Sequence, residues 1–199
     1  ILQFMRTLSM ADKFSKFEGL YFPYQVDFRG RKYTVSSFLT PQGTEYAKSL
    51  LTFANALPIE NQEQADWLAI HGANCAGVDK LTLKERIKWV EDNTDTIISV
   101  AKHDLNCEFW TKVDHPWLFL AFCYEWAGFK REGFGYKSSL PIALDGSNNG
   151  LQHYSAMLGC KIGGKATNLM NKDDPQDMYQ DVADCVLRDV RREMEEGDE

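Results

Sequence analysis

The sequence predicts an α+β fold in which helices dominate and strands are few. Apolar residues recur at the three- and four-residue spacing of one helix face in several segments of the 199-residue chain. Only a few short runs have the aromatic and β-branched composition of strands. Strands and helices do not alternate as in βαβ units, and the sequence contains neither G-x-G-x-x-G nor a P-loop. Any chemistry must therefore come from other motifs.

The first quarter of the chain predicts a helix, a hairpin and a second helix. Residues 1–17 carry apolar side chains at a helical period. The runs 20–26 and 31–35 flank D-F-R-G and predict a hairpin or two short strands, and Pro23 restricts the first strand to an edge or a bulge. Residues 44–55 follow the turn T-P-Q-G and predict the second helix.

The middle of the chain predicts four helices. Residues 60–78 form the first, with glycines that permit close packing. Thr82 followed by Glu85 is a capping box, which indicates the start of the second. The third spans 94–102. The fourth, 115–129, is apolar nearly all round over its first turns, so it is expected to be buried.

An acid stands between an apolar run and a polar turn in the last third of the chain. Residues 140–144 predict a buried strand that ends at Asp145, and the small polar residues 146–150 predict a tight turn. A helical pattern then begins at Leu151, and the D-P pair at 174–175 predicts the N-cap and first residue of a last helix. A carboxylate at such a junction is common as a turn residue or helix N-cap.

Composition allows a folded core and argues against several classes of protein. Hydrophobic residues make up 44% of the chain, which is enough for a core. No apolar run approaches the ~20 residues needed to cross a bilayer, so no membrane partner is expected, and we find no signal peptide. A net charge of −7 argues against simple coating of nucleic acid but permits a local basic track. The first residue is Ile1 rather than Met, which indicates an excised segment.

The cysteines and His71 do not form a metal-binding pattern. The five cysteines are odd in number and include no C-x-x-C pair, which argues against a structural zinc site. Several lie in apolar surroundings and are predicted to be buried free thiols in a reducing compartment. His71 has no second histidine four residues away, so we expect a core histidine rather than a ligand.

Two motifs have a functional interpretation beside a structural one. In V-D-F-R-G-R-K-Y, two guanidiniums and an aromatic ring on a tight turn could hold a nucleic-acid backbone and stack on a base, or could simply form a charged hairpin loop. In L-D-G-S-N-N-G, Asp145 at a strand end could bind Mg²⁺, which prefers oxygen ligands. The carbonyl of Gly146 could add a second ligand, because glycine lets the chain approach an ion closely.

Four segments resemble one family of enzymes. The segments "YFPYQVDFRGRKY", "IHGANCAGVDK", "LAFCYEWAG" and "LPIALDGSNNGLQHYSAM" occur in this order and with similar spacing in single-subunit, bacteriophage-type DNA-directed RNA polymerases. The similarity covers essentially the whole chain and is closer to the phage enzymes than to their mitochondrial relatives. The D-x-x-G-R and D-G-S-x-x-G-L-Q-H segments are specific to that family, which favours the functional interpretation of both motifs.

The resemblance implies part of the right-hand polymerase fold. Residues 1–18 would form a helix leading into the palm, and residues 19–161 would form the palm itself. A helical insertion in the palm would span about 56–134, and residues 162–199 would begin the fingers.

The resemblance also implies roles for individual residues. Asp145 matches the first catalytic aspartate and a ligand of Mg²⁺, and Gly146 would add its carbonyl. The loop residues Asp27, Phe28, Arg29 and Arg31 would contact the template and the RNA–DNA hybrid, and Lys48 would lie near the nucleic-acid path. At Gly150, related DNA polymerases carry a Glu that crowds the ribose 2′ position, so glycine favours ribonucleotides. This residue argues against a DNA polymerase.

The sequence departs from the family pattern in two respects. Asn148 stands where the family has a small Cys or Ala after D-G-S, which bears on local packing. The second catalytic aspartate and the fingers helix that binds the incoming nucleotide are not found in these 199 residues. The chain alone is therefore expected to be inactive, as a segment or a split subunit of the enzyme.

The implied function is DNA-templated RNA synthesis by a two-metal mechanism. The implied partners are template and promoter DNA, the RNA transcript, ribonucleoside triphosphates and the remainder of the polymerase, in the same chain or a separate subunit. The implied location is the cytoplasm of an infected bacterial host, with a mitochondrion or plastid as the alternative. A catalytically inactive, polymerase-derived module that binds nucleic acid is the alternative function.

Overall fold

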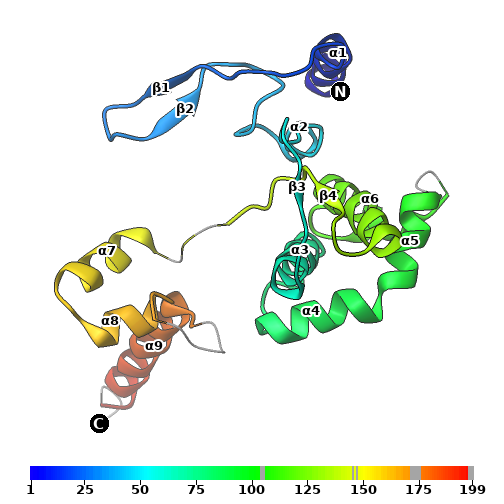
Figure 1. The fold of residues 1–199 in the computed structure, drawn as a ribbon. Coiled ribbons are helices and arrows are strands. Elements are labelled where there is room, and N and C mark those ends of the chain that lie inside the picture. Colours follow the sequence, from blue (N-terminus) through cyan, green and yellow to red (C-terminus); the bar gives the residue numbers. More distant parts are fainter. Residues whose placement is uncertain (104–105, 145, 147, 171–175, 197–199) are drawn as a thin grey trace. The chain divides into compact units, whose positions relative to one another are not determined.

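The computed structural model describes residues 1–103, 106–144, 146, 148–170 and 176–196. The chain forms two compact units, Ile1–Ala143 and Leu144–Glu199 (Figure 1). Helices predominate in both units, as the sequence predicts. None of the helices within these residues has the length and apolar character that a membrane span requires.

The first unit begins with a helix, a hairpin and a short second helix, which are α1 (Leu2–Phe14), β1 (Tyr24–Val26), β2 (Lys32–Thr34) and α2 (Glu45–Ser49). The strands are antiparallel, with Gln25 opposite Tyr33, so the predicted hairpin is confirmed. The helix predicted over 44–55 is shorter than expected. Beyond it the chain forms no regular element up to residue 55, and the N–H of Phe53 donates to the carbonyl of Ser139 at 2.8 Å instead of continuing the helix.

The helical body of the first unit follows. Its elements are β3 (Leu57–Pro58), α3 (Gln62–Cys75), α4 (Leu83–Asp92), α5 (Thr94–Lys102), the 3₁₀ helix η1 (Glu108–Lys112), α6 (Pro116–Glu132) and β4 (Lys137–Ser138), which pairs with β3. All four helices predicted for this region are confirmed. The capping box is also formed: the side chain of Thr82 accepts the N–H of Glu85, and the Glu85 carboxylate accepts the N–H of Thr82 at 3.0 Å.

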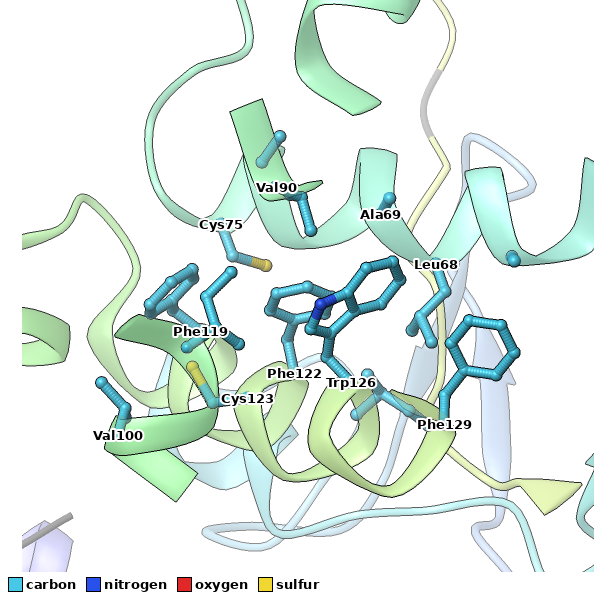
Figure 2. Packing of buried hydrophobic residues seen from close by; sticks show 14 of the residues in the cluster. Leu68, Ala69, Cys75, Val90, Val100, Phe119, Phe122, Cys123, Trp126 and Phe129 are labelled. Atoms are coloured by element: carbon cyan, nitrogen blue, oxygen red, sulfur yellow. The ribbon is translucent and has the colours of Figure 1, made fainter. Parts of the chain in front are cut away.

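The core of this body is a row of aromatic rings on α6 packed against α3 (Figure 2). Phe119, Phe122 and Trp126 are fully buried, and successive ring centroids are 5.8 Å apart. A Cβ at Gly72 of α3 would lie 2.2 Å from the ring of Phe122, so glycine is required for the two helices to approach this closely. The prediction that α6 is buried is confirmed for the face that packs against α3, whereas Trp117 and Tyr124 are 37% and 46% exposed.

Two predictions about individual core residues are also confirmed. His71 is only 4% exposed, and its Nε2 lies 3.6 Å from the Sγ of Cys75. Burial lowers the pKa of His71 to about 4 and raises the pKa of Cys75 to about 12, because the charged form of each group is poorly solvated there. Cys75 and Cys123 are buried free thiols, whereas Cys160 and Cys185 are exposed.

The second unit contains the helices α7 (Asn149–Met157), α8 (Lys161–Ala166) and α9 (Met178–Glu196). The D-P pair predicted to start the last helix lies outside the described residues. In the structure the carboxylate of Asp177 accepts the N–H groups of Tyr179 and Gln180, each at 3.1 Å, and so caps the first turn of α9.

The prediction of a buried strand over 140–144 is wrong. These five residues are described and form no strand, and exposure rises from 9% at Leu140 to 78% at Leu144. A strand needs a neighbour to satisfy its N–H and C=O groups. No strand within the described part of the chain pairs with this segment.

Candidate nucleic-acid interface and catalytic segment

The loop between β1 and β2 is a tight turn organised by Asp27. The N–H of Gly30 donates to the carbonyl of Asp27 at 3.0 Å, and Gly30 has a φ of +78°, which glycine adopts without steric cost. The Oδ1 of Asp27 accepts the N–H groups of Arg29 and Arg31, both at 2.9 Å. One carboxylate oxygen therefore fixes the backbone on both sides of the glycine.

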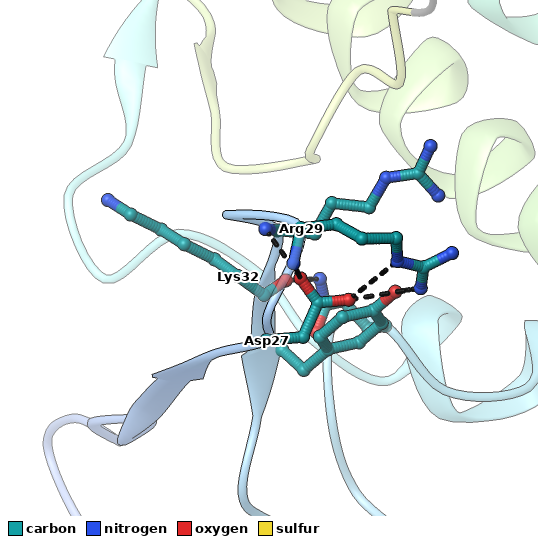
Figure 3. A network of polar contacts seen from close by, with 6 residues as sticks. Asp27, Arg29 and Lys32 are labelled. Carbon is teal, nitrogen blue, oxygen red and sulfur yellow. Dashed lines mark hydrogen bonds and ion pairs between the residues drawn. The ribbon is translucent and has the colours of Figure 1, made fainter.

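The other carboxylate oxygen holds a side chain (Figure 3). Oδ2 of Asp27 lies 3.0 Å from both Nε and Nη2 of Arg29, and Nη2 also donates to the hydroxyl of Tyr33 at 3.2 Å. The backbone N–H of Arg31 is the largest cause that lowers the pKa of Asp27 below its usual value, and the bonds from Arg29 act in the same direction. Asp27 therefore stays ionised at neutral pH and orders the turn.

The outer face of this loop is open. Phe28 is 96% exposed, and the guanidinium carbon of Arg29 lies 5.4 Å from its ring centroid. In the part of the chain that the structure describes, no hydrogen bond or ion pair engages the Arg31 guanidinium. Lys32 follows directly and is also exposed. It was not among the residues predicted from the sequence, although a third cation next to two arginines is visible there. An exposed ring beside free cations can stack on a base and contact phosphates.

Lys48 lies on a separate element. It is exposed in the last turn of α2, so it shares no hydrogen-bonded turn with the loop residues Asp27, Arg29 and Arg31. Glu45 of the same helix accepts the N–H groups of Trp117 and Leu118 at 2.6 and 3.2 Å, which caps the first turn of α6. Lys48 is therefore carried by a helix that is fastened to the helical body.

The segment predicted to bind metal is only partly described. Asp145 lies outside the described residues. A Cβ at Gly146 would lie 2.4 Å from Oδ1 of Asn149 and 3.1 Å from Oε1 of Gln152, so a larger residue at this position would require these two side chains to move. The oxygen-rich surroundings of Gly146 suit a hard cation such as Mg²⁺. Elsewhere in the described residues, no group of three or more His, Cys, Asp or Glu side chains could hold a metal ion.

The structure at the start of α7 shows the local surroundings of Asn148 and Gly150. Asn148 has a φ of +55°, a left-handed conformation that Asn tolerates better than most residues, and its side chain accepts the N–H of Leu151 at 3.5 Å. The residue that departs from the family pattern thus acts as the helix N-cap. A Cβ at Gly150 would meet no atom of the described residues within 4 Å, so packing against them does not require glycine there.

The chain is similar in sequence to known proteins over most of its length. A family model described as DNA-dependent RNA polymerase matches residues 59–199. The chain is 50% identical to the DNA-directed RNA polymerase of Enterobacteria phage K11 over 90% of its length, and 49% identical to the T7 RNA polymerase of Escherichia phage T7 over 93%. It is 38% identical to a mitochondrial DNA-directed RNA polymerase of Schizosaccharomyces pombe over 92%.

These identities are higher for the phage proteins than for the mitochondrial one, in agreement with the resemblance seen in the sequence. The matched segment is a limited part of each relative. It covers 20% of the K11 and T7 proteins and 16% of the mitochondrial protein, so the chain spans about a fifth of the length of its phage relatives.

Proposed function

The chain belongs to the DNA-dependent RNA polymerase family, and we propose that it contributes to DNA-templated RNA synthesis. The observation that carries this proposal is the match over 59–199 together with about half-identity to phage RNA polymerases. The partners would be template and promoter DNA, the transcript, ribonucleoside triphosphates and the rest of the polymerase. The identities to phage enzymes favour an infected bacterial cell as the location.

We propose that most of this chain forms part of a polymerase palm. In this assignment residues 1–18 lead into the palm, residues 19–161 form it with a helical insertion at about 56–134, and residues 162–199 begin the fingers. The aromatic core between α3 and α6 supports this assignment, because it gives the proposed insertion a hydrophobic core of its own.

The loop 27–31 would hold the template and the RNA–DNA hybrid. Arg31 supports this role because its guanidinium is not engaged by any described residue, and Phe28 supports it because its ring is almost fully exposed. Asp27 would keep the turn in shape, and Lys48 would add a phosphate contact from α2. These contacts position nucleic acid and carry no base sequence information by themselves.

The carboxylate of Asp145 and the carbonyl of Gly146 would hold Mg²⁺. When bound, the ions of a two-metal site stabilise charge on the attacking 3′ oxygen and on the departing pyrophosphate. The chain's own residues supply the rest: Asp145 is the proposed acidic ligand, Gly146 leaves room for a close backbone approach, and Gly150 leaves space beside the ribose 2′-hydroxyl. The second acidic ligand would come from polypeptide outside these 199 residues, so we expect no RNA synthesis by the chain alone.

The test is Asp145→Asn in the complete enzyme. Elongation on a preformed RNA–DNA hybrid should be abolished while promoter DNA binding is retained, because the substitution removes stabilisation made mainly in the transition state. Near-normal elongation at saturating Mg²⁺ would contradict the assignment. If template-dependent extension by the chain alone disappeared in Asp145→Ala, the site would be complete without a second polypeptide. Hybrid binding with no extension in any assembly would favour the inactive binding module.

A further inference from the structure

One side chain fastens the hairpin to the segment that follows it. The Oε1 of Gln42 accepts the N–H of Thr34 at 2.7 Å, and its Nε2 donates to the carbonyl of Lys32 at 2.8 Å. These two backbone groups lie on the edge of β2 that faces away from β1. The cross-strand bonds at either end of β2 are made by the carbonyl of Arg31 and the N–H of Val35, and the backbone groups of alternate residues point to opposite edges. The amide of Gln42 thus occupies the place that a third strand would take.

The segment that carries Gln42 is itself tightly folded. The N–H of Gly43 donates to the carbonyl of Thr40 at 3.0 Å, and a Cβ at Gly43 would lie 3.1 Å from that same oxygen. The hydroxyls of Thr34 and Thr40 are also hydrogen-bonded to each other, which adds a second link between β2 and this turn. The turn therefore holds the Gln42 side chain against the strand edge.

The link continues into the helical body. Three residues after Gln42, Glu45 caps the first turn of α6 through the N–H groups of Trp117 and Leu118. Residues 42–45 therefore connect the hairpin on one side to α6 on the other through side-chain bonds to backbone groups. The same short segment leads directly into α2, which carries Lys48.

We propose that Gln42 is a positioning residue that holds the hairpin, with Arg31 and Lys32, in a fixed relation to Lys48 on α2, so that these cations are prearranged when they meet a sugar–phosphate backbone. The inference rests on the proposed function of the loop. A cation on a loosely held hairpin must be ordered when nucleic acid binds, and that ordering reduces affinity. Gln42 itself makes no contact with nucleic acid in this proposal.

The test is Gln42→Glu, with binding measured by fluorescence anisotropy of the purified chain on a labelled RNA–DNA hybrid at low salt. At pH 8 the carboxylate can only accept, so the carbonyl of Lys32 loses its donor and we expect about 5- to 10-fold weaker binding. At pH 5 part of the carboxyl is protonated, and its O–H can again donate to that carbonyl. Because roughly a sixth of an ordinary glutamate is protonated at pH 5, the deficit relative to wild type should shrink slightly there.

The matched control is Gln25→Glu. Gln25 lies on β1 opposite Tyr33, and its side chain hydrogen-bonds to none of the described residues, so this variant adds the same charge to the hairpin that Gln42 contacts, without losing a bond. A second variant, Gln42→Leu, should bind weakly at both pH values and should speed hydrogen exchange at the amide of Thr34. The lost bonds, rather than the added charge, then account for the difference between Gln42→Glu and Gln25→Glu.

The results separate this inference from the proposed function. Arg31→Ala should weaken hybrid binding and reduce its salt slope by ~1. Unchanged binding by Arg31→Ala, or no binding by the wild-type chain, would refute the role of the loop and the inference with it. If Arg31→Ala weakens binding but Gln42→Glu matches Gln25→Glu at both pH values, the loop binds and Gln42 does not position it. Unchanged exchange at Thr34 in Gln42→Leu would overturn the inference in the same way.

Discussion

Acidification should destabilise the helical body through one buried histidine. His71 is 4% exposed, and its pKa falls from 6.5 to about 4 because burial disfavours the imidazolium. Below pH 6.5 the His71 imidazole is protonated in the unfolded chain, whereas in the folded chain it becomes protonated only at about pH 4. The free energy of unfolding should therefore be highest above pH 6.5 and decline as the pH falls toward 4.

The size of the effect follows from the two pKa values. A difference of one pKa unit corresponds to ~1.36 kcal/mol, so lowering the pH from 7.5 to 4.5 should remove roughly 2–3 kcal/mol of stability. Asp27 and Glu85 have pKa values lowered from 3.8 and 4.5, so most of their stabilising effect is lost at pH values below 4.5. The loss between pH 7.5 and 4.5 should therefore come chiefly from His71.

The assay is urea unfolding of the purified chain at several pH values, followed by tryptophan fluorescence. In His71→Leu the decline over this range should largely vanish, whatever the variant's stability at neutral pH. The matched control is His103→Leu, which removes an exposed histidine from the same unit and should keep the decline. Equal declines in wild type and His71→Leu would refute the reasoning, because the titration would then lie elsewhere.

Further predictions concern two glycines, one packed tightly against an aromatic ring and one with open space around it. Gly72→Ala should destabilise the chain by about 1–3 kcal/mol, because the new methyl group would overlap the ring of Phe122, whereas Gly150→Ala should leave urea unfolding nearly unchanged. Gly150→Glu in the complete enzyme should fold normally and selectively lose ribonucleotide incorporation, since a carboxylate there would crowd the 2′-hydroxyl. Equal losses with deoxyribonucleotides, measured by single-nucleotide extension, would assign Gly150 a role unrelated to the sugar.

The sequence predicts most of the helices of this chain because their signals are local. The apolar period over 115–129 and the capping box at Thr82 involve residues within one or two turns of each other, so no distant partner is needed to interpret them. The hairpin is equally local, because D-F-R-G supplies both the turn and the carboxylate that organises it. Much of the candidate interface was therefore predictable, including Arg31 and Phe28.

The features that were not predicted depend on distant partners. Residues 140–144 have the composition of a strand, but a strand forms only where a neighbour satisfies its backbone. The helix predicted over 44–55 ended early because Phe53 found a hydrogen-bond partner at Ser139. The bonds of Gln42 could not be read from the sequence either, because a glutamine in a turn gives no sign of which backbone groups its amide will reach.

Apolar residues are exposed next to the proposed metal ligand Asp145, and they give a physical reason why the chain alone should be inactive. Leu144 immediately precedes Asp145 and is 78% exposed, and on α7 Tyr154, Met157 and Leu158 are 65%, 80% and 78% exposed. The apolar spacing therefore predicts α7 correctly, but these apolar side chains remain largely exposed within the described residues. A metal ligand must be held by rigid surroundings if it is to act on a transition state. In a family whose phage members are about five times longer, we expect further polypeptide both to cover these faces and to supply the second acidic ligand. Burial of these apolar side chains and catalysis should then appear together when that polypeptide is added, and not one after the other.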